Sequence, residues 1–298
     1  MHWKTKAQLQ NLVSLLPPVF SERVYYLLQT LAGRVRFNAN SRITSLQTAH
    51  SLLEQNGYTV RGKKLIEIGT GTIPIVPICY HLLGARSVLT VDLNEQLRPS
   101  LTIKFLEWLN QHKQHLPFDQ SRLKNFMDNV RKFPLTEALR EAEIQYLPGS
   151  DARNLPFKDD SFDIAVSNRV MEHIEPRTVV AITNELDRLT TEVQLHRIDY
   201  SDHFSHSDKS ISRINFLQYS DNQWRKYGSN RYSYVNRLRH DDFTHMYSNE
   251  GFSFIDYPEV DESCDRLLKE GFSVARQFDG KGRNVLATTG AWFLLLKR

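Results

Sequence analysis

Residues 65–72, LIEIGTGT, constrain the fold of this chain more than any other stretch. The short apolar run at its start is typical of a strand that is covered on both faces. Gly69 and Gly71 follow, and glycine permits a sharp turn and a close approach to a ligand because it has no Cβ. Pro74 suits the first turn of a helix, which the later apolar spacing indicates. The sequence therefore predicts a ligand-binding turn at a helix N-terminus.

A second apolar run, residues 87–91, ends in Asp92. An acid there, about 20 residues past the glycines, is placed to bind ribose hydroxyls. This arrangement suits either a nicotinamide dinucleotide or S-adenosylmethionine (SAM). The third glycine of the dinucleotide fingerprint is absent, because the turn runs into Ile73 and Pro74, and an acid, Glu67, precedes the turn. Both features favour SAM over a nicotinamide cofactor.

Three later segments complete a pattern: GSDARNLPF at 149–157, DSFDIAVSN at 160–168 and MEHI at 171–174. With the glycine turn and Asp92, they resemble the class I SAM-dependent methyltransferases, specifically the small-molecule subgroup. The resemblance is clearest over residues 64–173, where the elements occur in the family's order. It implies an enzyme with SAM as cofactor. The implied fold is α/β, with a Rossmann-like, seven-stranded, mostly parallel sheet flanked by helices and an antiparallel last strand.

The resemblance also implies which residues hold the cofactor. Asp151 is expected to accept a hydrogen bond from the adenine amino group, and Asn168 to lie under the methionine part. The complete expected set is Glu67, Gly69, Thr70, Gly71, Asp92, Leu93, Asp151, Ala152, Asn168 and Arg169.

A Glu-x-x-Glu-His arrangement binds a divalent metal in the ubiquinone-type and small-RNA O-methyltransferases, which this chain resembles. Here Arg169 takes the first position, ahead of Glu172 and His173. A cation at that place would repel a metal ion, so we expect no metal. His173 is instead expected to pack and hydrogen-bond near the cofactor, and we assign it to the substrate side of the site.

The domain organisation follows from helical spacing and from the lengths of the connections. Residues 1–60 are expected to form a helical cap, with helices near residues 9–16, 24–31 and 41–55, on a SAM-binding domain at residues 61–298. A membrane-surface or partner helix is the alternative for this segment. About fifty residues separate Asp92 from the next strand, which predicts a helical insertion at residues 95–143. A substrate lid is expected at residues 204–245.

The predicted fifth strand, residues 192–198, leads into a cluster that contains His196, Asp199 and His203. Ligands of open α/β sheets bind beyond the carboxyl ends of the strands. A histidine that is neutral near pH 7 can remove a proton from a hydroxyl group. We therefore expect His203 to be the general base, with His196 and Asp199 as alternatives. Structural hydrogen bonding and metal binding are the alternatives for this cluster.

Residues 209–239 are rich in aromatic and basic side chains. Aromatic faces stack on rings, and arginine pairs with phosphate or carboxylate. We therefore expect Trp224, Arg225 and Tyr232 to bind an acceptor that could carry a sugar ring or a negative charge. The alternative is a surface cap whose arginines pair with aspartates, namely Asp221, Asp241 and Asp242.

The composition of the chain restricts its expected partners and its location. The 298 residues carry a formal charge of only +4, so nucleic acid is not an expected partner. The two cysteines, Cys79 and Cys264, have no metal-type spacing. No leader and no apolar run of about 18 residues is visible, so we expect a cytoplasmic protein without a transmembrane segment.

The expected function is O-methylation of a small molecule or a glycan precursor by in-line methyl transfer. An RNA or nucleotide methyltransferase and a non-catalytic SAM-binding regulatory subunit are the alternatives.

Overall fold

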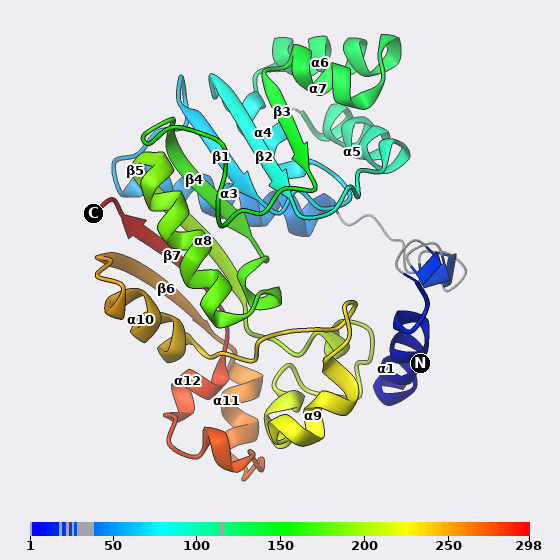
Figure 1. Cartoon of the computed structure of the whole chain (residues 1–298), viewed down its shortest axis with the longest axis vertical. Coiled ribbons are helices and arrows are strands. Elements are labelled where there is room, and N and C mark those ends of the chain that lie inside the picture. Colours follow the sequence, from blue (N-terminus) through cyan, green and yellow to red (C-terminus); the bar gives the residue numbers. More distant parts are fainter. Residues whose placement is uncertain (1, 18–19, 22–23, 26, 29–38, 114–115) are drawn as a thin grey trace.

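The computed structural model describes residues 2–17, 20–21, 24–25, 27–28, 39–113 and 116–298 (Figure 1). Its centre is a seven-stranded sheet in the order β3-β2-β1-β4-β5-β7-β6. Only β7 runs antiparallel to its neighbours, β5 and β6. This architecture confirms the predicted fold class. The strands are β1 (Lys64–Ile68), β2 (Ser87–Asp92), β3 (Ile144–Pro148), β4 (Phe162–Asn168), β5 (Thr190–Asp199), β6 (Phe254–Val260) and β7 (Thr288–Leu296).

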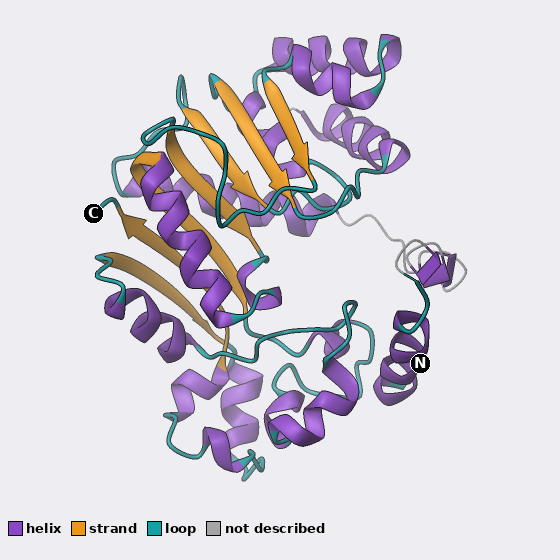
Figure 2. Cartoon of the chain, in the orientation of Figure 1, coloured by secondary structure: helices purple, strands orange, loops and turns teal. Residues whose placement is uncertain are grey.

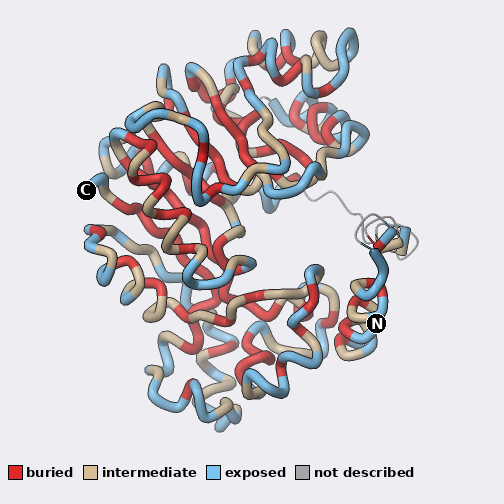
Figure 3. The backbone as a smooth tube through the Cα atoms, in the orientation of Figure 1, coloured by how far each residue is buried: buried red, intermediate tan, exposed pale blue. Residues whose placement is uncertain are grey.

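Helices cover both faces of this sheet, as the apolar strands require. Successive residues of β1 point to opposite faces, so Leu65 packs with one hydrophobic cluster and Ile66 with the other. The helices on the Leu65 face are α3 (Ala39–Gln55), α4 (Ile75–Leu82), α5 (Pro99–His112), α6 (Gln120–Lys132) and α7 (Leu135–Glu141). The helices on the Ile66 face are α8 (Pro176–Leu189) and α10 (His240–Asn249). Figure 3 shows that buried residues follow the strands between these layers.

The helices α5, α6 and α7 fill the connection between β2 and β3, where the sequence predicts an insertion. Asp119 fixes the start of α6, because its carboxylate accepts the backbone N–H groups of Ser121 and Arg122. Leu123 and Phe126 then anchor α6 to the same core as α4. The insertion therefore extends the helical layer on one face of the sheet.

A smaller helical body lies beyond the carboxyl ends of the strands (Figure 2). Its elements are η3 (His203–His206), η4 (Asn215–Gln218), α9 (Asp221–Gly228), α11 (Glu262–Lys269), η5 (Arg276–Phe278) and α12 (Arg283–Ala287). A separate hydrophobic cluster, which includes Phe204, Phe216 and Trp224, forms its interior. We call this body the lid body, because it contains the first part of the substrate lid predicted at residues 204–245; the end of that range begins α10, which packs on the sheet instead.

The N-terminal helix α1 (Trp3–Ser14) packs on the lid body beside α9 and away from the sheet (Figure 1). The Trp3 ring centroid lies 5.4 Å from that of Phe204 and 5.9 Å from that of Trp224. Its backbone N–H donates to Asp208 at 2.8 Å. Because α3 packs on the sheet, residues 1–60 do not form one helical cap. The helix expected at residues 24–31 lies largely outside the described residues.

Within the described ranges, every helix is too short or too polar to cross a membrane.

Candidate active site

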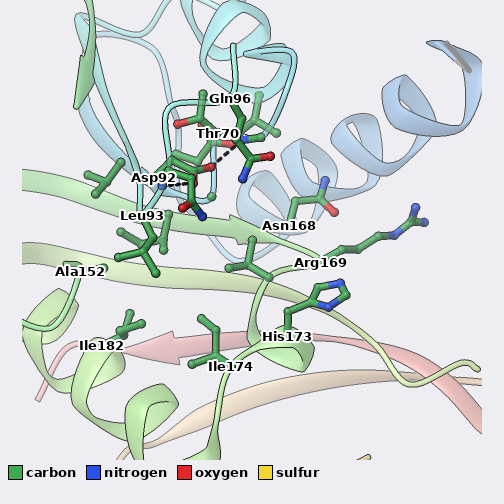
Figure 4. A pocket seen from close by; sticks show the side chains of 18 of the residues that line it. Thr70, Asp92, Leu93, Gln96, Ala152, Asn168, Arg169, His173, Ile174 and Ile182 are labelled. Carbon is green, nitrogen blue, oxygen red and sulfur yellow. Dashed lines mark hydrogen bonds between the residues drawn. The ribbon is translucent and has the colours of Figure 1, made fainter. Parts of the chain in front are cut away.

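A cavity of about 750 Å³ opens where the carboxyl ends of β1, β2 and β4 meet (Figure 4). The glycine turn, the loop after β3, η2 (Met171–His173), one side of α3 and residues of α4 and α8 also line it. All of the residues that the sequence assigns to cofactor binding line this cavity, as does His173. In Figure 4, Asp92 and Gln96 lie on one side of the cavity, and Ile174 and His173 lie on the other. The parallel strands thus bring together residues as far apart in the sequence as Glu67 and His173.

The glycine turn needs both of its glycines. Gly69 has φ +91°, and a Cβ at this position would lie 2.3 Å from Cγ2 of Val170. Gly71 has φ +65°, and a Cβ there would meet no heavy atom within 4 Å, so the turn borders open space. The Gly71 N–H donates to Asp92 Oδ2 at 2.8 Å. Asp92 therefore ties the turn to the end of β2, and its Oδ1 accepts the Asn94 N–H at 3.0 Å.

A chain of hydrogen bonds holds the Glu67 carboxyl group beneath the turn. Thr90 Oγ1 donates to Glu67 Oε2 at 2.5 Å, and it also lies 2.6 Å from Thr70 Oγ1. Burial raises the pKa of Glu67 to about 8, partly opposed by the hydrogen bond from Thr90. The Glu67 carboxyl is therefore mostly protonated at pH 7.

Replacing Glu67 with Gln is expected to flatten the pH dependence of stability. The folded-state pKa of Glu67, about 8, exceeds its ordinary value of 4.5, so the folded protein binds more protons than the unfolded chain between these values. Stability therefore falls as the pH rises through this window, by about 1 kcal/mol per pH unit from this one group. Urea denaturation at pH 5.5, 7.0 and 8.5 would measure the difference in slope between wild type and variant.

The control for this comparison is Glu141→Gln, which alters an exposed carboxylate on α7. Its pH dependence should match that of wild type. If stability depends on pH equally in wild type and Glu67→Gln, the raised pKa of Glu67 is contradicted.

The other expected cofactor residues have protein partners. Asp151 lines the cavity, but its carboxylate pairs with Arg153, with Nη2 and Oδ2 2.5 Å apart. The hydrogen bond from Arg153 lowers the pKa of Asp151 to about 2. The Asn168 amide donates to Ser45 Oγ at 3.2 Å. The strands therefore position Asn168, whereas Asp151 would have to share its carboxylate with Arg153 to accept an adenine amino group.

Several residues of the cavity wall could not be predicted from the sequence, among them Arg42, Ser45 and Gln96. Two arginines, Arg42 and Arg169, line this space. Burial and the nearby charge of Arg169 lower the pKa of Arg42. Arg169 also has φ +59°, an unfavourable conformation for a residue with a side chain. No local motif marks Arg42, because it reaches the cavity only through the packing of α3.

The chain brings a second group of side chains together beside the cavity. His173 ends η2, and His203 begins η3, the next element after β5, which ends at Asp199. Their ring centroids are 4.9 Å apart. Asp199 Oδ2 lies 3.9 Å from His203 Nε2. Burial lowers the pKa of His203 to about 3, so its imidazole is neutral at pH 7. Of the three expected catalytic residues, His203 thus lies next to His173, and Asp199 lies next to His203.

His196 does not reach the cavity. It is fully buried inside β5, where Nδ1 lies 2.8 Å from Ser167 Oγ and Nε2 lies 3.0 Å from Gln194 Oε1. Burial lowers the pKa of His196 to about 3. Because β5 continues to Asp199, His196 lies three residues before its end. The structure therefore supports a role in the core for His196, not a catalytic one.

The expected acceptor residues of the lid are also absent from the cavity wall. Trp224 is buried in the interior of the lid body, and Arg225 is exposed on α9. Tyr232 stacks on Tyr25 at 4.1 Å and donates to Ser21 Oγ. These side chains build or cover the lid body, so the interpretation as a surface cap replaces that of an acceptor site.

The inward-facing arginines agree with this interpretation. Arg237 pairs with Asp221, with Nη1 and Oδ1 3.0 Å apart. It also donates to the carbonyl oxygens of Phe216, at 2.7 Å, and Tyr219.

Comparison with known proteins adds an independent finding. Residues 125–192 match the family model described as a methyltransferase domain. No curated protein matches the chain.

Solved structures with a similar arrangement include magnesium protoporphyrin IX methyltransferase from Synechocystis with bound SAH. It is 12% identical, with 86% of this chain and 83% of that chain covered and a TM-score of 0.45. PH0226 protein from Pyrococcus horikoshii is 14% identical, with coverages of 87% and 92% and a TM-score of 0.47. Phosphoethanolamine N-methyltransferase 2 from Haemonchus contortus is 16% identical, with coverages of 83% and 51% and a TM-score of 0.46.

Proposed function

We propose that this chain, a class I SAM-dependent methyltransferase, transfers the methyl group to a hydroxyl of a small molecule, such as a sugar-containing precursor. In this reaction the acceptor oxygen attacks the methyl carbon in line with the C–S bond. The O–C bond forms as the C–S bond breaks, and the electron pair of that bond returns to sulfur. The oxygen loses its proton. Because the sulfonium is already activated, the protein's part is to position the acceptor and exclude water.

The observation that carries this proposal is the position of His173, His203 and Asp199 beside the cavity. An alcohol is a weak nucleophile, so it needs a group that binds or removes its proton. A substrate hydroxyl at this position would therefore require side chains beside the cavity that can accept its hydrogen bond. We therefore assign activation of the acceptor hydroxyl to His203. A general base is the simplest form of that role.

The lid body gives little support to the nucleic-acid alternative. Arg237 and Arg239 are buried and hydrogen-bonded to carbonyl groups inside it, and Trp224 lies in its interior. These three side chains are therefore unavailable to phosphates or bases, which favours a small-molecule acceptor, although Arg225 stays exposed on α9.

Replacing His203 with Ala is expected to lower kcat about 10²- to 10⁴-fold, the usual contribution of a group that assists proton removal. The dissociation constant for S-adenosylhomocysteine should stay within about threefold, because His203 does not line the cavity that holds the expected cofactor residues. The assay is S-adenosylhomocysteine release with a panel of small alcohols, phenols and sugars, with the methylated product identified by mass spectrometry.

Two outcomes would overturn the proposal. One is a product methylated at nitrogen or carbon, and the other is full activity of the His203 variant. The control variant is Arg225→Ala, because Arg225 is exposed on α9. It should keep wild-type turnover.

A further inference from the structure

Two arginines from different elements line the cavity close to each other. Arg42 lies in the first turn of α3, on the same face as Ser45, which accepts a hydrogen bond from the Asn168 amide at 3.2 Å. Arg169 directly follows Asn168 at the end of β4. Burial and the charge of Arg169 lower the pKa of Arg42, so the two guanidinium groups are near enough to repel each other.

Neither arginine is neutralised by an acidic side chain. Among the described residues, neither the Arg42 nor the Arg169 side chain forms an ion pair or a hydrogen bond. Both side chains remain accessible from the cavity. Two like charges that face one space without a partner make that space favourable for an anion.

The acids around the cavity do not supply this charge. Asp92 accepts backbone N–H groups of the glycine turn and of the loop after β2, and Asp151 pairs with Arg153. Glu172 is only 2% exposed, and burial raises its pKa to about 8, so it is mostly protonated at pH 7. Glu175 lines the cavity, but within the described ranges it makes no ion pair. The missing negative charge must therefore come from a ligand.

The cofactor does not bring enough negative charge. SAM has one carboxylate, but it also has an ammonium and a sulfonium, so its net charge is positive. Its carboxylate leaves at least one of the two arginines without a counter-charge. A cation bound beside two arginines adds repulsion, which a negative group on the second substrate would offset.

Arg169 also lies beside the residue to which we assign activation of the acceptor. Burial is the main cause of the lowered pKa of His203, and the charge of Arg169 adds to it. The Arg169 N–H donates to the carbonyl oxygen of Arg197 at 2.8 Å, so the neighbouring strand holds the backbone at this point. In Figure 4 the Arg169 side chain extends away from Thr70 and Asp92. An anion bound there would therefore lie on the acceptor side, away from the ribose end of the cofactor.

We propose that Arg42 and Arg169 bind a carboxylate or phosphate group of the acceptor, so that the substrate is an anionic hydroxy compound. Guanidinium groups bind both kinds of oxyanion through paired hydrogen bonds. The site rests on the proposed function, because the bound anion is taken to be part of the acceptor. The arginines hold one end of this molecule, and its hydroxyl lies toward His203, which positions the reacting oxygen.

The test is calorimetric titration of the full chain, saturated with S-adenosylhomocysteine, with matched pairs of probes. Glycerol phosphate is compared with glycerol, and salicylate with salicyl alcohol. We expect the anionic member of each pair to bind at least about tenfold more tightly than the neutral member, as charge-assisted hydrogen bonds commonly provide. Inorganic phosphate should compete with the anionic probes. If the anionic probes do not bind, or bind no more tightly than the neutral ones, the proposal is wrong.

Variants locate the binding. Arg42→Gln and Arg169→Gln should each weaken binding of the anionic probes by about tenfold and leave the neutral probes unchanged. Both side chains are exposed, so these variants are expected to fold. The matched control is Arg140→Gln, which alters an exposed arginine on α7 and should behave as wild type does. Equal binding of the anionic probes by wild type and by the double variant would overturn the proposal, because the anions would then bind elsewhere.

A second titration separates the acceptor from the cofactor. S-adenosylhomocysteine is compared with methylthioadenosine, which has no carboxylate. If the two variants weaken binding of the first compound and spare the second, the arginines bind the carboxylate of the cofactor, and the proposal is overturned. No methyl donor is present in these titrations. A product methylated at nitrogen or carbon would therefore contradict the proposed O-methylation and leave the anion site unaffected.

Discussion

Replacing Arg239 with Met is expected to lower the free energy of unfolding by about 3 kcal/mol, which is the cost of leaving several buried carbonyl groups without a donor. The Arg239 side chain is completely buried. Its guanidinium donates to the carbonyl oxygens of Tyr200, at 2.7 Å, Leu286, at 3.0 Å, and Thr288. It therefore joins the end of β5 to the α12–β7 junction at the base of the lid body.

Urea denaturation of wild type, Arg239→Met and Arg225→Met measures this effect. Arg225 is exposed on α9, so its variant should stay within about 0.5 kcal/mol of wild type. Arg239→Lys keeps a charge but not the planar set of donors, so an intermediate loss is expected. Equal stability of the two methionine variants would show that these carbonyl contacts contribute little.

Replacing Gly69 with Ala is expected to abolish measurable SAM binding and to cost about 2–4 kcal/mol of stability, through backbone strain and overpacking. The new Cβ would lie 2.3 Å from Cγ2 of Val170, at a φ of +91° that alanine disfavours. Either Val170 or the turn must move, and both line the cavity. Calorimetric titration with S-adenosylhomocysteine and thermal denaturation together measure the two effects.

Two further variants separate the clash from the strain. Gly71→Ala places a Cβ in open space at φ +65°, so it should lose only about 1 kcal/mol of stability. The double variant Gly69→Ala with Val170→Ala removes the nearest methyl group and should regain part of the lost stability. If the double variant is no more stable than Gly69→Ala alone, strain accounts for the loss and the clash with Val170 does not.

The cofactor side of the cavity could be predicted from the sequence because its signals are local. Two glycines after an apolar run indicate a tight turn, and an acid after the next apolar run marks the end of a strand. Each of these signals spans only a few residues. The residues at the ends of β1, β2 and β4 then meet, because parallel strands end at the same edge of a sheet. All of the expected cofactor residues line the cavity for this reason.

The acceptor side could not be predicted because its signals are not local. His196 and Asp199 are equally plausible from composition, and only the length of β5 shows that one is interior and the other terminal. Trp224 and Tyr232 belong to an aromatic, basic stretch, and composition does not reveal which side chains face inward. Arg42 reaches the cavity through helix packing over a long sequence separation.

The position of β7 has a consequence for biosynthesis. This strand lies between β5 and β6, although it follows both in the chain, and it pairs residues 193–199 with residues 290–296. Until β7 has been synthesised, β5 can pair only with β4, and the edges of β5 and β6 that β7 will cover remain unpaired. Completion of the sheet must therefore wait until residues 288–296 have emerged, which makes this half of the domain the late and aggregation-prone step of folding.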